Sequence, residues 1–193
     1  MPNWNNTTIK AKGIAKLDIF TVYKEEEGKQ IDFNKIIPEP SSKTECPKDF
    51  RLINGRRPDG GDAHLQVDND REWFNWYDWR CKFWGVKWNA CDTYIEDDDT
   101  ISFDTPWCAP LPVLLKLSEM LGDVEMEVNT YDGDDYHGVW HLSFKNGKCF
   151  KEEWEHDDYY DCDDDEEDGD NGDVSAIQSE TQYEEISEAN LPF

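Results

Sequence analysis

The chain has 193 residues, of which 45 are acidic and 19 are basic, so its formal net charge is −26. A field of this sign repels nucleic acids and anionic membranes and attracts basic surfaces, which argues against direct binding to DNA, RNA or lipid. No apolar run approaches the ~18 residues of a membrane span, and the polar amino terminus lacks a signal-peptide pattern, so we expect a soluble protein of the cytosol.

The first third of the chain predicts a few short elements and a long loop. Weak alternation over residues 6–12 indicates an edge strand, and apolar residues at helical spacing then predict a helix over residues 14–26. Residues 32–40 contain two prolines, which bias their predecessors away from helix, so this segment is expected to be extended. Residues 41–69 are rich in glycine, proline and serine, which predicts a loop insertion.

The middle of the chain predicts two helices that flank a hairpin. One stripe of a helix over residues 71–84 contains Trp73, Trp76, Tyr77 and Trp84, and this stripe is expected to be buried. Strands over 90–96 and 100–105 flank an acidic turn, and an apolar face predicts a second helix over 110–121.

Three alternating segments follow, over residues 124–131, 138–144 and 148–154. Short turns between neighbouring strands require antiparallel pairing. The sequence therefore predicts an α+β domain over residues 1–154, with an antiparallel sheet and the helices over 71–84 and 110–121 packed on one face. Nearly all aromatic residues precede residue 155, whereas residues 155–193 hold 16 acidic and no basic residues, so this segment is interpreted as an acidic tail.

Several motifs resemble a known family. They are, in chain order, Met1–Trp4, Asp32–Pro40, Trp84–Ala90, Phe103–Trp107, Ala109–Val113 and Leu117–Ser118. In order and rough spacing they are similar to the YubB-like family of phage and plasmid proteins, over about residues 1–150. The resemblance implies a ferredoxin-like fold and an origin in a mobile element, and it implies no catalytic residue.

Enzyme motifs are missing from the sequence. None of the six cysteines forms a C-x-x-C pair, which argues against a zinc ribbon or a thioredoxin-like motif, and the thiols are expected to be reduced. The sequence contains no P-loop, G-x-S-x-G or H-E-x-x-H motif. We therefore predict no catalytic residue, no cofactor and no metal site, and the protein is not expected to be an enzyme.

Clustered carboxylates are the candidate partner-binding residues. They form three clusters, of which two lie in loops of the domain and the third lies in the tail. The clusters are Asp97, Asp98 and Asp99; Asp132, Asp134 and Asp135; and Asp157, Asp158, Asp161, Asp163, Asp164, Asp165, Glu166, Glu167, Asp168 and Asp170. Same-face carboxylates of an extended chain recur every ~6.6 Å, whereas duplex DNA carries one charge per ~1.7 Å of its axis. The tail is therefore sparser than DNA by itself, but a tail beside the acidic loops would approach the charge density of DNA.

The leading hypothesis is a mobile-element protein that inhibits a basic host protein, such as a nucleic-acid-binding defence protein, by mimicking DNA. One alternative is an accessory protein whose tail serves solubility. Another is a metal-binding protein or metal-dependent enzyme that uses the Asp clusters, since Asp164–Gly169 resembles the start of a calcium loop and His137, His141 and Cys149 are possible ligands. The tryptophans between Trp73 and Trp107 are expected to pack in the core rather than to stack on bases.

Overall fold

The computed structural model of the protein describes residues 3–22, 28–53, 56–57, 59, 71–131 and 138–156. The chain divides into two units, Met1–Tyr160 and Asp161–Phe193, and the described residues all belong to the first.

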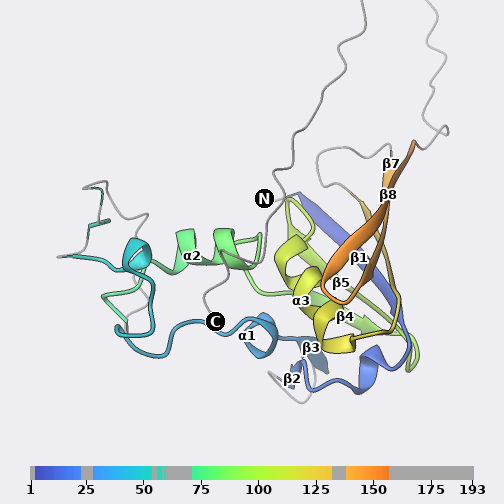
Figure 1. The fold of residues 1–193 in the computed structure, drawn as a ribbon, viewed down its shortest axis with the longest axis horizontal. Helices are drawn as coiled ribbons and strands as arrows, with labels where there is room; N and C mark the ends of the chain where they lie inside the picture. Colours follow the sequence, from blue (N-terminus) through green and yellow to red (C-terminus); the bar gives the residue numbers. More distant parts are fainter. Residues whose placement is uncertain are drawn as a thin grey trace, which may run out of the picture. The chain divides into compact units, whose positions relative to one another are not determined.

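Six strands form one antiparallel sheet in the order β4-β5-β1-β6-β7-β8 (Figure 1). Their bounds are β1 (Trp4–Ala11), β4 (Cys91–Ile95), β5 (Thr100–Pro106), β6 (Met126–Tyr131), β7 (Gly138–Lys145) and β8 (Lys148–His156). A separate ladder pairs β2 (Phe20–Val22) with β3 (Lys29–Ile31). The helical elements are η1 (Ile14–Lys16), α1 (Phe33–Ile36), η2 (Lys48–Phe50), α2 (Trp76–Phe83) and α3 (Leu111–Leu121).

Four of the six strands reproduce a known topology. β1 lies between β5 and β6, and β4 pairs only with β5 in this sheet, so the order is that of a β-α-β-β-α-β ferredoxin-like unit. β7 and β8 extend this unit by an antiparallel hairpin, and β8 forms the outer edge of the sheet. The predicted antiparallel sheet is thus confirmed for all six strands, but the segment expected to be an edge strand is β1, which has a partner on both sides.

The two faces of the sheet differ in what covers them. Buried and exposed residues alternate along β6 from buried Met126 to exposed Tyr131, as expected of a sheet with one covered and one open face. α3 packs on β7 and β8, and α1 packs beside α3 (Figure 1). The apolar face predicted for residues 110–121 is therefore correct, since Val113, Leu114 and Leu117 of α3 are fully buried.

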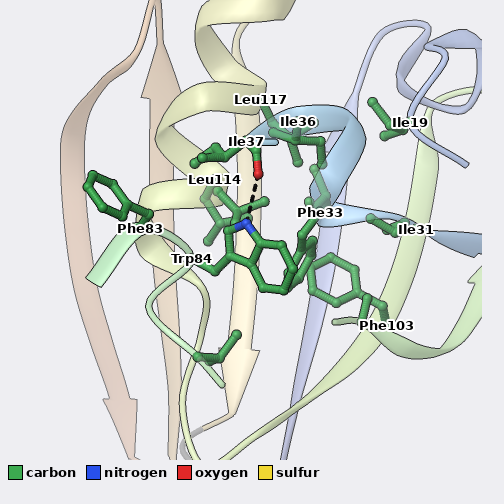
Figure 2. Close-up of a cluster of buried hydrophobic side chains, with 14 of the residues drawn as sticks. Ile19, Ile31, Phe33, Ile36, Ile37, Phe83, Trp84, Phe103, Leu114 and Leu117 are labelled. Carbon is green, nitrogen blue, oxygen red and sulfur yellow. Dashed lines mark hydrogen bonds between the residues drawn. The ribbon is translucent and has the colours of Figure 1, made fainter. Parts of the chain in front are cut away.

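Trp84, the residue after α2, lies at the centre of the core (Figure 2). Its ring is fully buried and meets the ring of Phe33 edge-on at 5.7 Å between centroids. Its indole N–H donates to the carbonyl oxygen of Ile37 over 2.9 Å, so its polar atom is satisfied inside the core. The ring thereby connects the end of α2 to the segment that follows α1.

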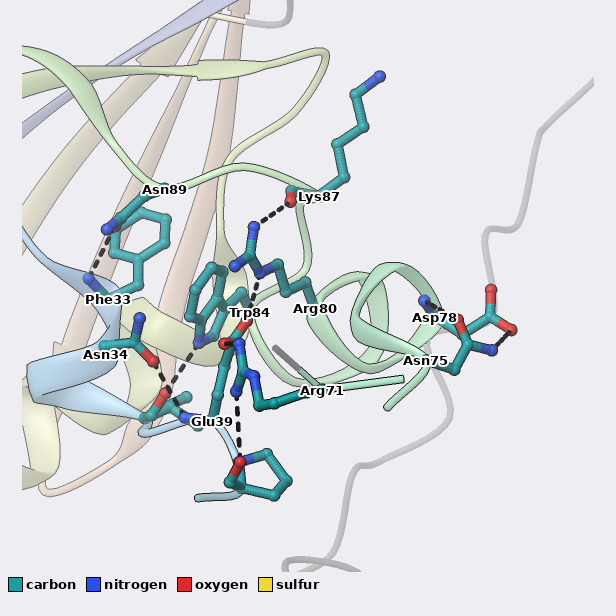
Figure 3. Close-up of polar contacts among 12 residues, drawn as sticks. Phe33, Asn34, Glu39, Arg71, Asn75, Asp78, Arg80, Trp84, Lys87 and Asn89 are labelled. Atoms are coloured by element: carbon teal, nitrogen blue, oxygen red, sulfur yellow. Dashed lines mark hydrogen bonds and ion pairs between the residues drawn. The ribbon is translucent and has the colours of Figure 1, made fainter. Parts of the chain in front are cut away.

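A buried ion cluster holds α2 to the same segment (Figure 3). The side chain of Glu39 is 5% exposed, and its two oxygens accept from Arg71 over 2.6 Å and from Arg80. The guanidinium of Arg80 also lies over the rings of Trp76 and Trp84, at 4.9 and 4.8 Å from their centroids. Because both arginines bind one carboxylate, the position of α2 depends on charge pairing as well as on apolar packing.

The first predicted helix is wrong. Residues 14–26 were expected to be helical, but η1 ends at Lys16 and Leu17 is already extended. β2 follows and pairs with β3, with Phe20 opposite Ile31. Tertiary pairing thus overrides a weak helical pattern. In the segment expected to be extended, α1 forms because Asp32 caps it, with its side chain accepting from the backbone N–H of Asn34 over 3.0 Å.

The second predicted helix is shorter than expected and has a different neighbour. α2 begins at Trp76 rather than at residue 71, after Asn75 as the N-cap. Its main contact is with η2, where Phe50 meets Phe83 at 5.5 Å between ring centroids, rather than with the sheet. Of the stripe predicted to be buried, Trp73, Trp76 and Tyr77 are only half-buried, whereas Trp84 is fully buried. The buried aromatic residues of this region are Phe74, Trp79, Phe83 and Trp84.

Replacement of Gly85 by Ala tests the approach of this segment to α3. Gly85 has φ +83°, and a Cβ there would lie 2.9 Å from Cδ of Pro112. Gly85→Ala is expected to lower the free energy of unfolding by roughly 2–4 kcal/mol, because it combines left-handed strain with overpacking.

Gly13→Ala is the matched control, since Gly13 has φ +78° but nothing within 4 Å of the added Cβ. Urea unfolding of both variants should show a smaller loss for Gly13→Ala. Equal losses would mean that the contact with Pro112 contributes nothing.

Candidate functional site

The acidic turn between β4 and β5 is held to the loop after β1. The backbone N–H of Gly13 donates to a carboxylate oxygen of Asp99 over 2.7 Å, and Lys16 pairs with Asp98 over 2.6 Å. The carbonyl oxygens of Asp98 and Asp99 accept from Ala15 and Ala11. Two of the three carboxylates thus stabilise the fold while remaining at the surface, where the side chain of Asp98 is 71% exposed.

Titration of this turn follows from the same contacts. The backbone N–H of Asp99 donates to Asp97 over 2.8 Å, which lowers the pKa of the Asp97 carboxyl. The hydrogen bond from Lys16 to Asp98 raises the pKa of the Lys16 ammonium. Both groups are charged at neutral pH, and the contribution of Asp97 to stability is lost only as the pH falls through its lowered pKa.

The other predicted carboxylates lie outside the described residues. They are Asp132, Asp134 and Asp135 of the loop, and Asp157, Asp158, Asp161, Asp163, Asp164, Asp165, Glu166, Glu167, Asp168 and Asp170 of the tail. The strand ends that flank them are described, because Tyr131 pairs with Val139 and Gly138 pairs with His156. The loop and the tail therefore both begin at the same end of the sheet.

The turn at Asp97–Asp99 belongs to the opposite end of the sheet. Ala11, which donates to Asp99, pairs with Met126 at the start of β6, whereas the acidic loop follows Tyr131 at its end. At ~3.4 Å per residue, the length of β6 separates the two ends by about 17 Å. The fold does not place this turn beside the point where the tail begins.

The open face of the sheet carries further carboxylates that were not among the predicted binding residues. The neighbours of these carboxylates along each strand point to the opposite face, which the helices cover. The carboxylates are Asp104, Glu127, Glu153 and Glu155. Glu153 is opposite His141 in the pairing of β7 with β8. A carboxylate oxygen of Glu155 lies 2.9 Å from Nε2 of the same histidine, which is hydrogen-bond distance. The period-two pattern of the strands was a signal that would have found them.

Most of the net charge arises in one part of the chain. Residues 1–90 contain 15 basic and 14 acidic residues, whereas residues 91–193 contain 4 basic and 31 acidic residues. The negative field therefore originates in β4–β8, their connections and the segment after them.

The prediction that the tryptophans are core residues is correct for some and wrong for others. Trp79 and Trp84 are buried, but Trp88 and Trp107 are 39% and 40% exposed. Both lie in connections at the end of the sheet, where strand ends leave less cover than in the middle.

The described residues offer little for metal or thiol chemistry. Among them, no three His, Cys, Asp or Glu side chains lie close enough to hold a metal ion. His137 and the run Asp164–Gly169 lie outside the described part of the chain. Burial, with Asp92 and Asp104 nearby, raises the pKa of the Cys91 thiol to about 11, so this thiol is protonated at neutral pH and is a poor nucleophile.

A sequence model described as "Ferredoxin-like domain in Api92-like protein" matches residues 83–186, which is more than half of the chain. The chain belongs to this family. The match begins at the last residue of α2 and includes the whole of β4–β8 and α3, so the family domain contains the strongly acidic part of the molecule. The ferredoxin-like strand order agrees with it.

Comparison with solved structures gives a weaker likeness. A crystal structure of the protein Api92 from Yersinia pseudotuberculosis is similar at 15% identity and a TM-score of 0.35, over 40% of this chain and 29% of that chain. The match thus spans less than a third of the length of that protein. No curated protein matches the chain. Within the described part of the chain, every helix is too short or too polar to cross a membrane.

Asp99→Ala tests the structural role of the acidic turn. The change removes the acceptor for the backbone N–H of Gly13, and the free energy of unfolding should fall by about 1 kcal/mol, the usual net value of one hydrogen bond. Glu96→Ala is the control, an exposed carboxylate in the same connection. Chemical denaturation at neutral pH measures both variants, and an equal effect of the two would contradict the role of Asp99.

Proposed function

We propose that the protein binds a basic, nucleic-acid-binding protein of a host cell and keeps DNA from it by presenting carboxylates in place of phosphates. The observation that carries the proposal is the charge asymmetry of the chain. Residues 91–193 hold 31 acidic residues against 4 basic ones, while residues 1–90 are nearly neutral. Solubility depends on the total charge, so it does not require the carboxylates to be concentrated in one part of the chain.

The spacing of the carboxylates on the sheet supports this role. Glu153 and Glu155 are two residues apart on β8 and share the open face, which at ~3.4 Å per residue separates them by roughly 6.8 Å. Phosphates of one DNA strand advance ~3.4 Å per nucleotide along the axis, so this spacing corresponds to every second phosphate. The preceding residue on this face is Lys151, so the row of carboxylates begins at Glu153. Glu155 is the last of them before β8 ends at His156.

These carboxylates are available to a partner. Glu153 pairs with Lys151 over 2.9 Å, but the side chains are 60% and 52% exposed, and Glu155 is 73% exposed. Exposed pairs of this kind contribute ~0–1 kcal/mol each, so arginines or lysines of a partner can replace them at little cost. Many weak contacts, rather than one strong contact, are expected to supply the affinity.

The origin in a phage or plasmid, implied by the sequence resemblance, belongs to the same proposal. A mobile element benefits from a protein that occupies the DNA-binding groove of a host defence protein. The ferredoxin-like fold is compatible with this role but does not imply it, since one fold carries many functions.

The test is capture from a bacterial lysate on the immobilised full-length chain, followed by elution with duplex DNA. If carboxylates occupy a phosphate-binding groove, duplex DNA should release the captured proteins, and capture should weaken steeply as salt is raised. Retention of every captured protein at saturating duplex DNA would rule out mimicry of DNA.

Substitutions locate the contact surface. Five changes, Asp163→Asn, Asp164→Asn, Asp165→Asn, Glu166→Gln and Glu167→Gln, should together reduce capture by tenfold or more, because the single contributions are small and add up. The matched control removes five exposed carboxylates from the neutral part of the chain: Asp18→Asn, Glu45→Gln, Asp49→Asn, Asp59→Asn and Glu72→Gln. Equal losses in the two variants would indicate that only total charge matters, which is the solubility alternative.

A further inference from the structure

Three tryptophans gather on the surface at one end of β1. Trp4 begins β1, Trp88 lies in the connection from α2 to β4, and Trp107 follows β5. The ring centroids of Trp4 and Trp88 are 6.2 Å apart, and those of Trp88 and Trp107 are also 6.2 Å apart, with the second pair stacked at 29°. The three side chains are 46%, 39% and 40% exposed. We call them the tryptophan patch.

The fold fixes the tryptophan patch through several backbone contacts. Trp4 is opposite Pro106 in the pairing of β1 with β5, and the backbone N–H of Trp107 donates to the carbonyl oxygen of Asn3 over 2.8 Å. Trp107 has φ +69°, a left-handed conformation that is rare for a bulky side chain and that persists only where the surrounding structure enforces it. Large exposed apolar groups held in this way are typical of binding surfaces.

The rings of the tryptophan patch already hold a cation. The ammonium of Lys87 lies 4.2 Å from the ring centroid of Trp88 and 4.0 Å from that of Trp107, within the ~6 Å range of a cation–π contact. Figure 3 shows that the Lys87 side chain points away from the Arg80 network, which contacts only its backbone carbonyl. The ammonium of Lys87 thus contacts the rings of Trp88 and Trp107, and its position shows where these rings stabilise a positive charge.

One carboxylate shares the open face of the sheet with Trp4. Asp104 is two residues before Pro106, the partner of Trp4, and its side chain accepts from Asn6 over 2.7 Å. Asp104 is thus the diagonal neighbour of Trp4, and Cβ atoms in this relation lie ~7–8 Å apart. Ring faces with a carboxylate at their border match an arginine, whose flat guanidinium stacks on aromatic rings and binds carboxylate oxygens at its edge.

We infer that the tryptophan patch is a docking site for an arginine side chain of a basic protein partner, which takes the place that Lys87 occupies in the free protein. The basic nature of the partner rests on the proposed function, whereas the ability of the patch to bind arginine does not. A nucleobase would also stack on these rings, but single-stranded nucleic acids need a positively charged groove, and this chain has a net charge of −26.

The test measures binding of an octa-arginine peptide to the full-length chain by tryptophan fluorescence and calorimetry. Lys87→Ala should raise the affinity for octa-arginine about threefold to tenfold, because the peptide no longer competes with the internal cation for the rings. Lys148→Ala is the matched control, since it removes the same charge from an exposed lysine of β8 and leaves the rings unchanged. Its effect should stay within about twofold.

Two further measurements complete the design. Trp88→Leu should weaken binding of octa-arginine several-fold, whereas Phe150→Leu, which alters an exposed aromatic residue on β8, should not. Octa-lysine should respond less than octa-arginine to Lys87→Ala, because an ammonium cannot stack and bridge to a carboxylate in the same way.

The outcomes separate this inference from the proposed function. Equal effects of Lys87→Ala and Lys148→Ala would show that only charge is sensed, and the inference would be overturned. Binding of an oligothymidine that is weakened by Lys87→Ala would overturn it in favour of a base-stacking surface. Failure of duplex DNA to release lysate proteins would end the mimicry proposal, but it would leave an arginine-specific response of the patch intact.

Discussion

Burial of Trp84 is the interaction on which the arrangement of the helical segments depends. One ring contacts Phe33, Trp79 and the guanidinium of Arg80, and its N–H bonds the carbonyl oxygen of Ile37. Removal of a buried tryptophan side chain typically costs about 3–5 kcal/mol. Because Arg80 also binds Glu39, the ring and the ion cluster fix the same segment from two sides. The connection that contains Lys87 and Trp88 begins directly after Trp84, so its first residues are fixed in position by the core.

The molecule separates two kinds of surface. The acidic turn and the carboxylates of β8 present negative charge, whereas the tryptophan patch presents aromatic rings that hold a lysine. Long-range charge accelerates the encounter with a basic protein, while aromatic rings and desolvated contacts supply residence time. The two proposals thus describe successive stages of one association, and they depend on different residues.

Much of the sheet was predictable because its signals are local. The alternation of the strands and the apolar face of α3 are both contained within short windows of sequence. The helix predicted over residues 14–26 was wrong because pairing of β2 with β3 decides that segment. The site was harder to predict: the acceptor of the Gly13 N–H is 86 residues away, and the exposure of Trp88 and Trp107 depends on which connections meet at the end of the sheet. The composition predicted the acidic character of the chain, but no local pattern distinguished an exposed tryptophan from a buried one.

The outer edge of the sheet bears on self-association. β3 covers the other edge, since its backbone and Gln30 hydrogen-bond with Thr93 of β4, but β8 has no neighbouring strand on its outer side among the described residues. A long bare edge is a template for aggregation through β-sheet extension. Glu152, Glu153 and Glu155 line this strand, and two copies approaching edge to edge would bring carboxylates and two −26 chains together. Electrostatic repulsion therefore opposes pairing of two copies through this strand.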